Sequence, residues 1–232
     1  MSAYVGDELS LFAHASNWKN YWSSMISPFL GETVLDVGAG LGSTIRAAAG
    51  PKQKRWVAIE PDDSLAEELR AGVGDGTLPS SVEVVTGTLD AVEEKFHSVL
   101  YIDVLEHIED DKTEMQKAIE RVLPGGNLIV LSPAHQFLYT PFDEGIGHFR
   151  RYSKATLSAC QPDGSEQVLL RYLDGVGIAA SLANRMLLQQ SMPTQSQIAK
   201  WDKFMVPVSR VIDPMTGYHI GKSVLAVWRR VK

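Results

Sequence analysis

Short apolar runs alternate with amphipathic segments through most of the chain. The runs of strand length stand at 33–37, 55–60, 82–86, 97–102 and 126–131. Helical spacing predicts helices between several of them, over about 42–49, 62–72 and 111–123. Apolar runs that alternate with helices are typical of parallel strands covered on both faces. The pattern therefore predicts an α/β protein with a mostly parallel sheet between helices.

The two ends of the chain add further elements to this pattern. Apolar residues at helical spacing predict one or two helices within 9–30, which serve either as a packing cap or as a lid over a ligand cleft. Ser153 is suited to cap a helix that follows it. A proline followed by glycines, Pro124-Gly125-Gly126, is expected to end the helix before it. Further strands are predicted at 167–173 and 223–229, with two helical patterns between them that separate near Met192-Pro193-Thr194.

Length and composition favour one domain. A chain of 232 residues with 44% hydrophobic residues is long enough for one sizeable α/β core. We divide residues 1–232 into parts by their predicted roles. These are an N-terminal helical cap at 1–30, a ligand-binding core at 31–174, a helical insertion or lid at 175–221, and the last strand at 222–232.

Charge and cysteine content exclude some classes of function. The net charge of −6 argues against a general nucleic-acid binder, because neutralising phosphates requires a basic face. The single cysteine, Cys160, cannot form an intrachain disulfide, which fits a reducing cytoplasm. The first residues resemble no secretory signal, and the apolar stretch 176–188 is too short to cross a bilayer. We expect a soluble, cytoplasmic protein without stable membrane insertion.

A glycine turn directly follows the first predicted strand. Gly38 and Gly40 allow the backbone to turn tightly and to approach a ligand closely. Glu60 ends the next apolar strand, where its carboxylate can accept hydrogen bonds from both hydroxyls of a ribose. The pair predicts a site for a nucleoside.

The residues around this turn distinguish between nucleosides. Ser43 occupies the place of the third glycine in the dinucleotide fingerprint. Asp36, as an anion at the end of the strand, would repel a pyrophosphate and favour a cationic amino-acid ligand. An NAD(P)-dependent oxidoreductase remains the alternative, although Tyr152 lacks the lysine four residues later that such an enzyme would need.

Several segments in the correct order resemble class I S-adenosylmethionine-dependent methyltransferases. They are 34–42 with Glu60, Leu105-Glu106-His107 and Pro124-Gly125-Gly126, and the likeness covers about 18–172. Leu105-Glu106-His107 resembles the corresponding segment of small-molecule methyltransferases similar to the quinone-biosynthetic group. The resemblance implies a Rossmann-like fold with a seven-stranded, mostly parallel sheet, an antiparallel last strand and a helical insertion before it.

The same resemblance implies a cofactor and its contacts. S-adenosylmethionine would be the methyl donor and S-adenosylhomocysteine the product. The acceptor would be an oxygen or nitrogen nucleophile on a small, partly apolar molecule. A degenerate, non-catalytic binding module with the same fold is a further alternative. The residues implied to contact the cofactor are Asp36, Gly38, Ala39, Gly40, Glu60, Pro61, Thr88, Leu89 and Asp103.

Two histidines are candidate general bases. His107 follows the fourth strand close to Asp103, and an imidazole that titrates near neutral pH can take a proton from the nucleophile. The alternative is a histidine that only orients the loop. His148 is the second candidate base, and His135 is the third.

Candidate acceptor contacts lie after the fifth strand. Arg151 and Tyr152, together with Tyr139, could bind an anionic or planar acceptor. Alternatively, Arg150 and Arg151 pair with acids such as Asp143 and Glu144 and hold the loop in place. The insertion 175–221 would form either an apolar lid for a lipid-like or aromatic acceptor, or an ordinary core or dimer contact. The protein would be a monomer or a homodimer. Metal-ligand spacing is absent from the sequence, so we predict no metal.

Overall fold

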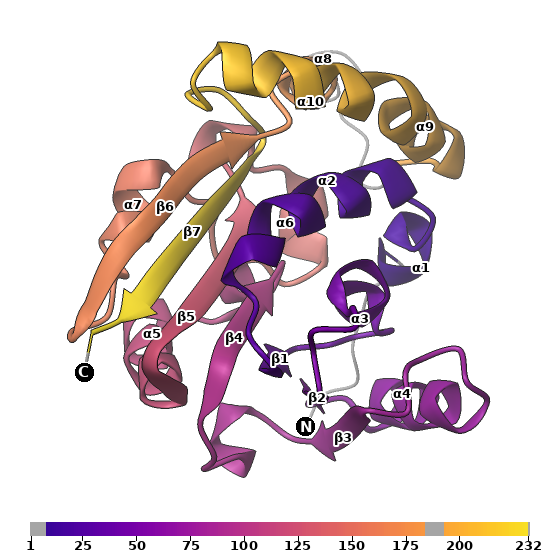
Figure 1. Cartoon of the computed structure of the whole chain (residues 1–232). Coiled ribbons are helices and arrows are strands. Elements are labelled where there is room, and N and C mark those ends of the chain that lie inside the picture. Colours follow the sequence, from indigo (N-terminus) through magenta and orange to yellow (C-terminus); the bar gives the residue numbers. More distant parts are fainter. Residues whose placement is uncertain (1–7, 184–192, 232) are drawn as a thin grey trace.

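A single seven-stranded sheet forms the centre of the computed structural model, which describes residues 8–183 and 193–231 (Figure 1). The strands are β1 (Thr33–Val37), β2 (Arg55–Glu60), β3 (Val82–Thr86), β4 (Phe96–Ile102), β5 (Val122–Pro133), β6 (Ser165–Leu173) and β7 (Ser223–Arg230). Their order is β3-β2-β1-β4-β5-β7-β6. Strands β1 to β5 pair in parallel, whereas β7 is antiparallel to both β5 and β6. The predicted fold class is confirmed.

Helices cover both faces of the sheet. The helices are α1 (Glu8–Phe12), α2 (Ser16–Ile26), α3 (Ser43–Ala48), α4 (Asp63–Gly74), α5 (Asp111–Glu120), α6 (Pro141–Gly145), α7 (Lys154–Ser158), α8 (Gly177–Ala183), α9 (Gln195–Lys200) and α10 (Val206–Met215). A π-helical turn, Trp201–Met205, joins α9 to α10. Apolar residues of α5 and α7 pack in one buried cluster, and those of α2, α3 and α4 pack in the other. The sheet therefore has a separate core on each face.

Local capping chemistry starts several helices where the sequence predicts. The side chain of Asp62 accepts hydrogen bonds from the backbone N–H groups of Ser64 and Leu65 at the start of α4. Ser153 accepts from the backbone N–H of Thr156 in the same way and begins α7. These caps place the end of β2 and the loop before α7 at the carboxyl edge of the sheet.

The expected position of the helix end before β5 is wrong. Helix α5 already ends at Glu120, and Pro124-Gly125-Gly126 lies inside β5. Val122 pairs with Phe96, and the register between β4 and β5 then shifts before Ser98 meets Asn127. A Cβ on Gly126 would come within 2.6 Å of the His97 carbonyl oxygen, so the glycine permits close pairing at this irregularity.

The insertion is fastened to the N-terminal helix. Asp202 accepts hydrogen bonds from the backbone N–H groups of Asn17 and Trp18 and so caps α2 from a distant part of the chain. Asp213 accepts a hydrogen bond of 2.7 Å from the Tyr21 hydroxyl. In Figure 1 α8, α9 and α10 lie above α2, beyond the carboxyl ends of the parallel strands. The first residues of the predicted cap, 1–7, and positions 184–192 of the predicted insertion lie outside the described residues.

Within residues 8–183 and 193–231, the helices are all too short or too polar to pass through a bilayer.

Candidate active site

The glycine turn after β1 is held against β2. Gly38 has a φ of +68°, and a Cβ there would lie 2.7 Å from a methyl group of Val104. The backbone N–H of Ala39 donates to the Ile59 carbonyl oxygen at 3.0 Å. Since a larger residue would meet both backbone strain and a collision, the turn requires glycine at position 38.

Glu60 joins this turn to the end of β2. Its Oε2 atom accepts a hydrogen bond of 2.8 Å from the Gly40 N–H, and Oε1 accepts one of 3.0 Å from the Asp62 N–H. Burial raises the pKa of this carboxyl above its usual value. The carboxylate therefore stands between the glycine turn and the start of α4, and its ribose-binding role stays a prediction.

The predicted adenine edge lies beside Glu60. The N–H of Gly87, which follows β3, donates to the Glu60 carbonyl oxygen at 3.0 Å and brings the ends of β2 and β3 together. Pro61 and Thr88 are exposed at this edge, where a ring could contact them. Leu89 is buried, so its side chain packs in the core behind this edge and is not exposed at it.

Asp36 differs from its expected electrostatic role. The side chain is only 1% exposed, and burial, followed by the charge of Glu60, raises its pKa to about 8. Among the described residues, its Oδ2 atom has no hydrogen-bond partner. The carboxyl is mainly protonated at neutral pH, so the prediction that an Asp36 anion repels a pyrophosphate is wrong for the ligand-free chain.

A cavity of about 760 Å³ opens beside the glycine turn. Its lining includes Gly38, Ala39 and Gly40 of the turn, together with Asp103, His107, His148 and Arg151. Aromatic side chains from the N-terminal helices, the α6 region and the π-helical turn complete it: Phe12, Trp18, Trp22, Phe142, Trp201 and Phe204. The fold thus brings the predicted cofactor turn and the two predicted catalytic histidines to one cavity.

His148 is oriented by an ion pair. Its Nδ1 atom lies 2.9 Å from Asp143 Oδ1, and Arg151 contacts both oxygens of Asp143, through Nε at 2.7 Å and Nη2 at 2.9 Å. The pKa of Asp143 falls to about 2 because its hydrogen bonds from His148 and Arg151, together with the arginine charge, outweigh the effect of burial. Since Asp143 is ionised, Nδ1–H of His148 donates to it, and a neutral ring leaves Nε2 as an acceptor.

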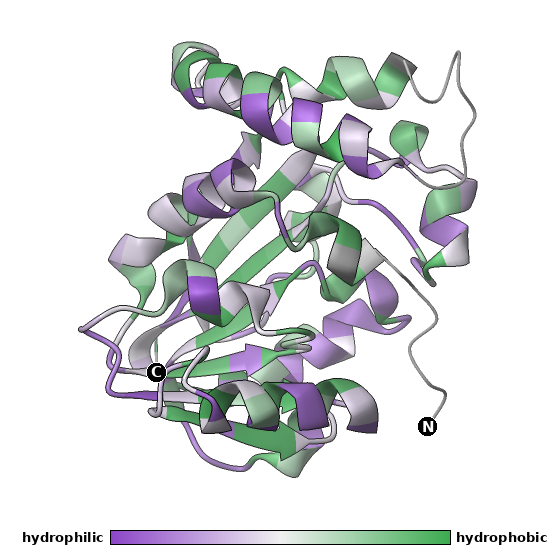
Figure 2. Cartoon of the chain, turned by 90° about the vertical axis from the view of Figure 1, so that its right-hand side faces the viewer, coloured by the Kyte–Doolittle hydropathy of each residue, from purple (hydrophilic) through white to green (hydrophobic). Residues whose placement is uncertain are grey.

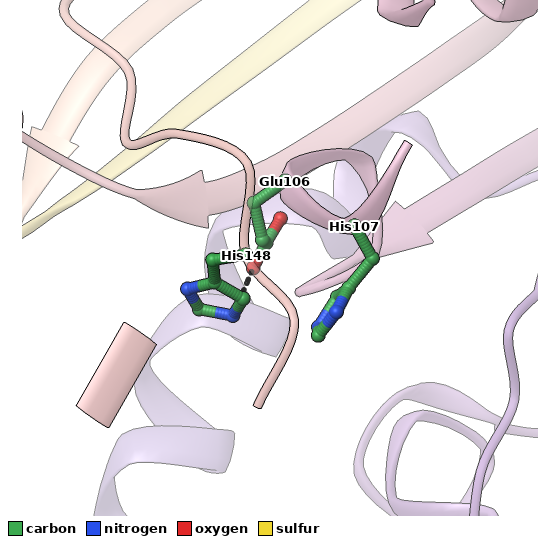
Figure 3. A group of neighbouring side chains, drawn as sticks. All are labelled: Glu106, His107 and His148. Carbon is green, nitrogen blue, oxygen red and sulfur yellow. Dashed lines mark ion pairs between the residues drawn. The ribbon is translucent and has the colours of Figure 1, made fainter. Parts of the chain in front are cut away.

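His107 packs against His148 but differs from it electrostatically. The two ring centroids are 4.5 Å apart and the planes make an angle of 80° (Figure 3). Burial, with the charge of His148 adding to it, lowers the pKa of His107 to about 4. The expectation that His107 titrates near neutral pH is wrong, and its ring is neutral under ordinary conditions.

Glu106 completes a cluster with the two histidines. Its Oε1 atom lies 3.9 Å from Nε2 of His148, and one ligand atom from each of Glu106, His107 and His148 lies within 4.8 Å of the others (Figure 3). Burial, with the charge of Asp103 adding to it, raises the pKa of Glu106 well above its usual value. In the part of the chain that the structure describes, neither carboxyl oxygen of Glu106 has a hydrogen-bond partner.

This cluster has the residue types to hold a divalent cation. The spacing along the chain shows no sign of this cluster, because His148 follows a loop and a short helix far from Glu106 and His107. The absence of a metal therefore stays a prediction.

Asp103 lies at the end of β4 in a strained conformation. Its φ is 55°, in the left-handed region, and its N–H donates to the Leu131 carbonyl oxygen at 2.8 Å. The residue is exposed toward the cavity, but loss of hydration among the surrounding protein atoms raises the pKa of the carboxyl to about 6, with His148 and Lys222 opposing that rise. The carboxyl of Asp103 therefore changes charge close to neutral pH at the wall of the cavity.

The predicted acceptor contacts have different locations. Arg151 lines the cavity but pairs with Asp143, as the alternative interpretation expects, whereas Arg150 pairs with Asp111 at 2.6 Å. Tyr152 is 1% exposed and donates to Asp111 Oδ2 at 2.7 Å, and Tyr139 donates to the His148 carbonyl oxygen at 2.6 Å. Among the described residues, both tyrosines fall outside the cavity lining and support the loop that carries His148.

Sequence reasoning missed two lysines in the cavity wall. Nζ of Lys222 lies 3.6 Å from the ring centroid of Trp201 and 3.6 Å from Asp174 Oδ2. Nζ of Lys19 donates to Ser43 Oγ at 3.1 Å, next to the glycine turn. Lys19 is the single charged residue of α2, and this isolated charge was the available signal for it.

A family model matches part of the core. Residues 34–126 match a model described as a methyltransferase domain. The match covers this segment of the chain, and the seven-stranded sheet has the arrangement of the class I methyltransferase fold. A comparison with curated proteins finds no match. The predicted relationship to class I methyltransferases is confirmed, and the closer relation to the quinone-biosynthetic group stays a prediction.

Solved structures share the fold of the methyltransferase domain and its flanks. A geranyl diphosphate methyltransferase in complex with S-adenosylmethionine is 11% identical, with a TM-score of 0.68, and the match covers 98% of this chain and 94% of that one. Coclaurine N-methyltransferase, bound to N-methylheliamine and S-adenosylhomocysteine, is 17% identical, with a TM-score of 0.61 and coverage of 91% and 72%. The cyclase SpnF is 13% identical, with a TM-score of 0.60 and coverage of 97% and 94%. At these identities the likeness establishes the fold alone.

Proposed function

We propose that the protein transfers a methyl group from S-adenosylmethionine to an oxygen or nitrogen of a small, partly apolar molecule. The observation that carries the proposal is the shared cavity. The glycine turn, which lies in the segment matched by a methyltransferase domain, and two histidines line this cavity. A binding site for the cofactor and groups able to accept a proton thus face the same space.

The residues present fit the cofactor. The backbone at Gly38 and Gly40 has positive φ and leaves no side chain between the turn and the cavity. Glu60 would accept hydrogen bonds from the ribose hydroxyls, and Pro61 and Thr88 would contact the adenine edge. Lys19, beside Ser43, would bind the carboxylate of the amino-acid end. When bound, the cofactor supplies an electrophilic methyl group on a sulfonium.

His148 is the group that would take the proton of the acceptor. Asp143 and Arg151 hold its ring in one orientation, so that Nε2 is free to accept. His107 stays neutral and packs edge-on against this ring, which limits its rotation. Positioning the nucleophile next to the methyl group accounts for most of the expected acceleration.

The walls of the cavity indicate the nature of the acceptor. Trp18, Trp22, Trp201 and Phe204 offer apolar surface, and Arg151 and Lys222 offer charge on one side. A molecule with an apolar body and one polar end fits this arrangement. A large nucleic acid does not, since the cavity is enclosed by aromatic rings rather than by a basic groove.

Two measurements test the proposal. Thermal unfolding should be shifted upward by S-adenosylhomocysteine and unchanged by NAD, because a ligand stabilises only the fold that binds it. A shift by NAD alone would favour the oxidoreductase alternative. The protein is then incubated with methyl-labelled cofactor and a fractionated metabolite extract. Label recovered in a small product supports catalysis, whereas cofactor binding without any transfer would favour a non-catalytic module.

A further inference from the structure

The outer surface of the helical run 195–215 carries an apolar stripe. Phe204, Val208, Val211 and Met215 follow one another at intervals of four, three and four residues, and they are 61%, 46%, 64% and 81% exposed. Residues at this spacing share one side of a helix. We call these four side chains the outer stripe. Ile212 and Ile220, also exposed, lie close to it in sequence.

The inner side of the same helix is well packed. Val206, Ser209 and Asp213 are buried, and the Ser209 hydroxyl donates to Asp174 Oδ1 at 2.6 Å. Trp201, one turn earlier, donates from Nε1 to Asp174 Oδ2 at 2.7 Å. The helix that carries the outer stripe is therefore firmly attached to the rest of the protein through its opposite side.

The charges around the outer stripe all have one sign. The acids in 175–221 are Asp202 and Asp213, and both are buried in hydrogen bonds to α2 or to the backbone after β6. Lys200, Lys203 and Arg210 are exposed. Within residues 193–220, every exposed lysine, arginine, aspartate or glutamate is basic, although the whole chain has a net charge of −6.

This surface is continuous with the candidate active site. Phe204 belongs both to the outer stripe and to the lining of the cavity, and Lys200 and Met205 line the cavity as well. Figure 1 shows α9 and α10 at the outer edge of the molecule, and Figure 2 shows hydrophobic and hydrophilic positions alternating along these helices. A molecule that leaves a surface in contact with the outer stripe would enter the cavity directly.

We propose that the outer stripe and its basic rim dock the protein on an anionic lipid surface. An apolar helix face flanked by lysine and arginine is suited to lie at the boundary between headgroups and acyl chains. A second copy of this chain fits less well, because pairing two stripes would bring Lys203 and Arg210 of both copies together. Docking does not depend on methyl transfer. Delivery of a partly apolar acceptor from the lipid to the cavity rests on the proposed function.

Flotation of the full chain with vesicles tests the docking. The vesicles are phosphatidylcholine alone and phosphatidylcholine mixed with phosphatidylglycerol, each at low and at high salt. We expect binding to the mixed vesicles at low salt, and its loss at high salt. Each basic residue near such a surface favours binding by about fivefold, so Lys203→Gln with Arg210→Gln should weaken binding about 25-fold.

A matched control removes the same charge elsewhere. Lys52 and Lys54 are exposed before β2, at the opposite edge of the sheet, and Lys52→Gln with Lys54→Gln should leave vesicle binding within about twofold of the wild type. A third variant, Val211→Ser with Met215→Ser, keeps every charge and should weaken binding to the mixed vesicles. Circular dichroism checks that each variant is folded.

Several results would overturn the proposal. Equal binding to both kinds of vesicle would show that docking does not require anionic lipid. Equal losses of binding in the two charge variants would show that the outer stripe and its basic rim are not the docking surface. Sedimentation of the wild type as a dimer that Val211→Ser with Met215→Ser dissociates would assign the outer stripe to self-association instead. Because the assay needs no cofactor, its failure leaves the proposed methyl transfer untouched.

Discussion

The two halves of the sheet are built by contacts of different range. In the half with β3, β2, β1 and β4, Glu60 reaches Gly40 across 20 residues, and Asp62 caps its own helix. In the half with β5, β7 and β6, the holding contacts run from Asp213 to Tyr21, 192 residues away, and from Asp202 to Trp18, 184 residues away. The candidate cofactor turn in the first half is therefore formed by local motifs, whereas the helices beside the second half are held by distant partners.

The largest loss of stability is expected from disrupting the buried hydrogen-bond network of Asp213 in the second half. Asp213→Ala leaves the Tyr21 hydroxyl and the N–H groups of Asp174 and Gly175 without their acceptor in a buried site. We expect the free energy of unfolding to fall by about 3–5 kcal/mol. Urea unfolding measures it, and Tyr21→Phe, which removes one of these contacts, should cost about 1 kcal/mol. Equal losses in the two variants would contradict the shared network.

The next effect concerns the histidines where the two halves meet. His148→Ala should lower the turnover rate about 100-fold or more, because the oriented proton acceptor is lost. Single-turnover kinetics with labelled cofactor measure the rate, and calorimetry with S-adenosylhomocysteine should show nearly unchanged affinity. His107→Ala is the comparison, and since its ring is only a neutral neighbour it should slow turnover less. A larger loss at His107 would reverse the two assignments.

A smaller effect should be confined to the first half. Glu60→Ala removes the acceptor proposed for the ribose hydroxyls, and we expect S-adenosylhomocysteine to bind about 30–100-fold more weakly. Calorimetry measures the dissociation constant, and the thermal midpoint without ligand shows whether the fold is intact. Asp62→Ala provides a control, because it removes the side-chain cap of α4 and keeps the backbone N–H that donates to Glu60. The same affinity in Glu60→Ala and wild type would remove Glu60 from the site.

Asp36, in the first half, should make the free energy of unfolding depend on pH. Its folded pKa of about 8 lies above the unfolded value, so the stabilisation present below about pH 4 is lost as the pH rises through about 8. Within this window the free energy of unfolding should fall by up to about 1.4 kcal/mol per pH unit from this group. Urea unfolding across pH 5–8 measures the slope, which Asp36→Asn should reduce. An unchanged slope would mean that Asp36 ionises normally.

The smallest expected effect is that of removing metal. Burial raises the pKa of Glu106 and so disfavours the carboxylate form with which the cluster of Glu106, His107 and His148 would hold a cation. We expect turnover to be unchanged after dialysis against EDTA. If turnover is lost and magnesium or zinc restores it, Glu106, His107 and His148 would be assigned as a cation site.

The first half of the sheet was predictable because short sequence segments determine its structure. Its strands, the turn at Gly38 and Gly40, and the cap at Asp62 all depend on neighbours close in sequence. The likeness to the family model, over 34–126, has nearly the same limits. The beginning of β5 at Val122 was missed because pairing with Phe96 overrides the proline and glycines that follow.

The second half was only partly predictable. The spacing of apolar residues in 175–221 indicated helices, but their partners follow from tertiary contacts that leave no local signal. Likewise, burial lowers the pKa of His107, and Asp143 turns Nε2 of His148 toward Glu106. Neither effect can be predicted from the sequence, because the fold desolvates the ring of His107 and orients the ring of His148.

Trp201 gives the molecule an optical reporter of its own. The indole is held by Asp174, covered by the Lys222 ammonium and exposed to the cavity on one side. A charge this close to the ring shifts the energy of its excited state, so displacement of the lysine by an incoming molecule would change the colour and intensity of the emitted light. Occupation of the acceptor space can therefore be followed by fluorescence, without a label and before any acceptor has been identified.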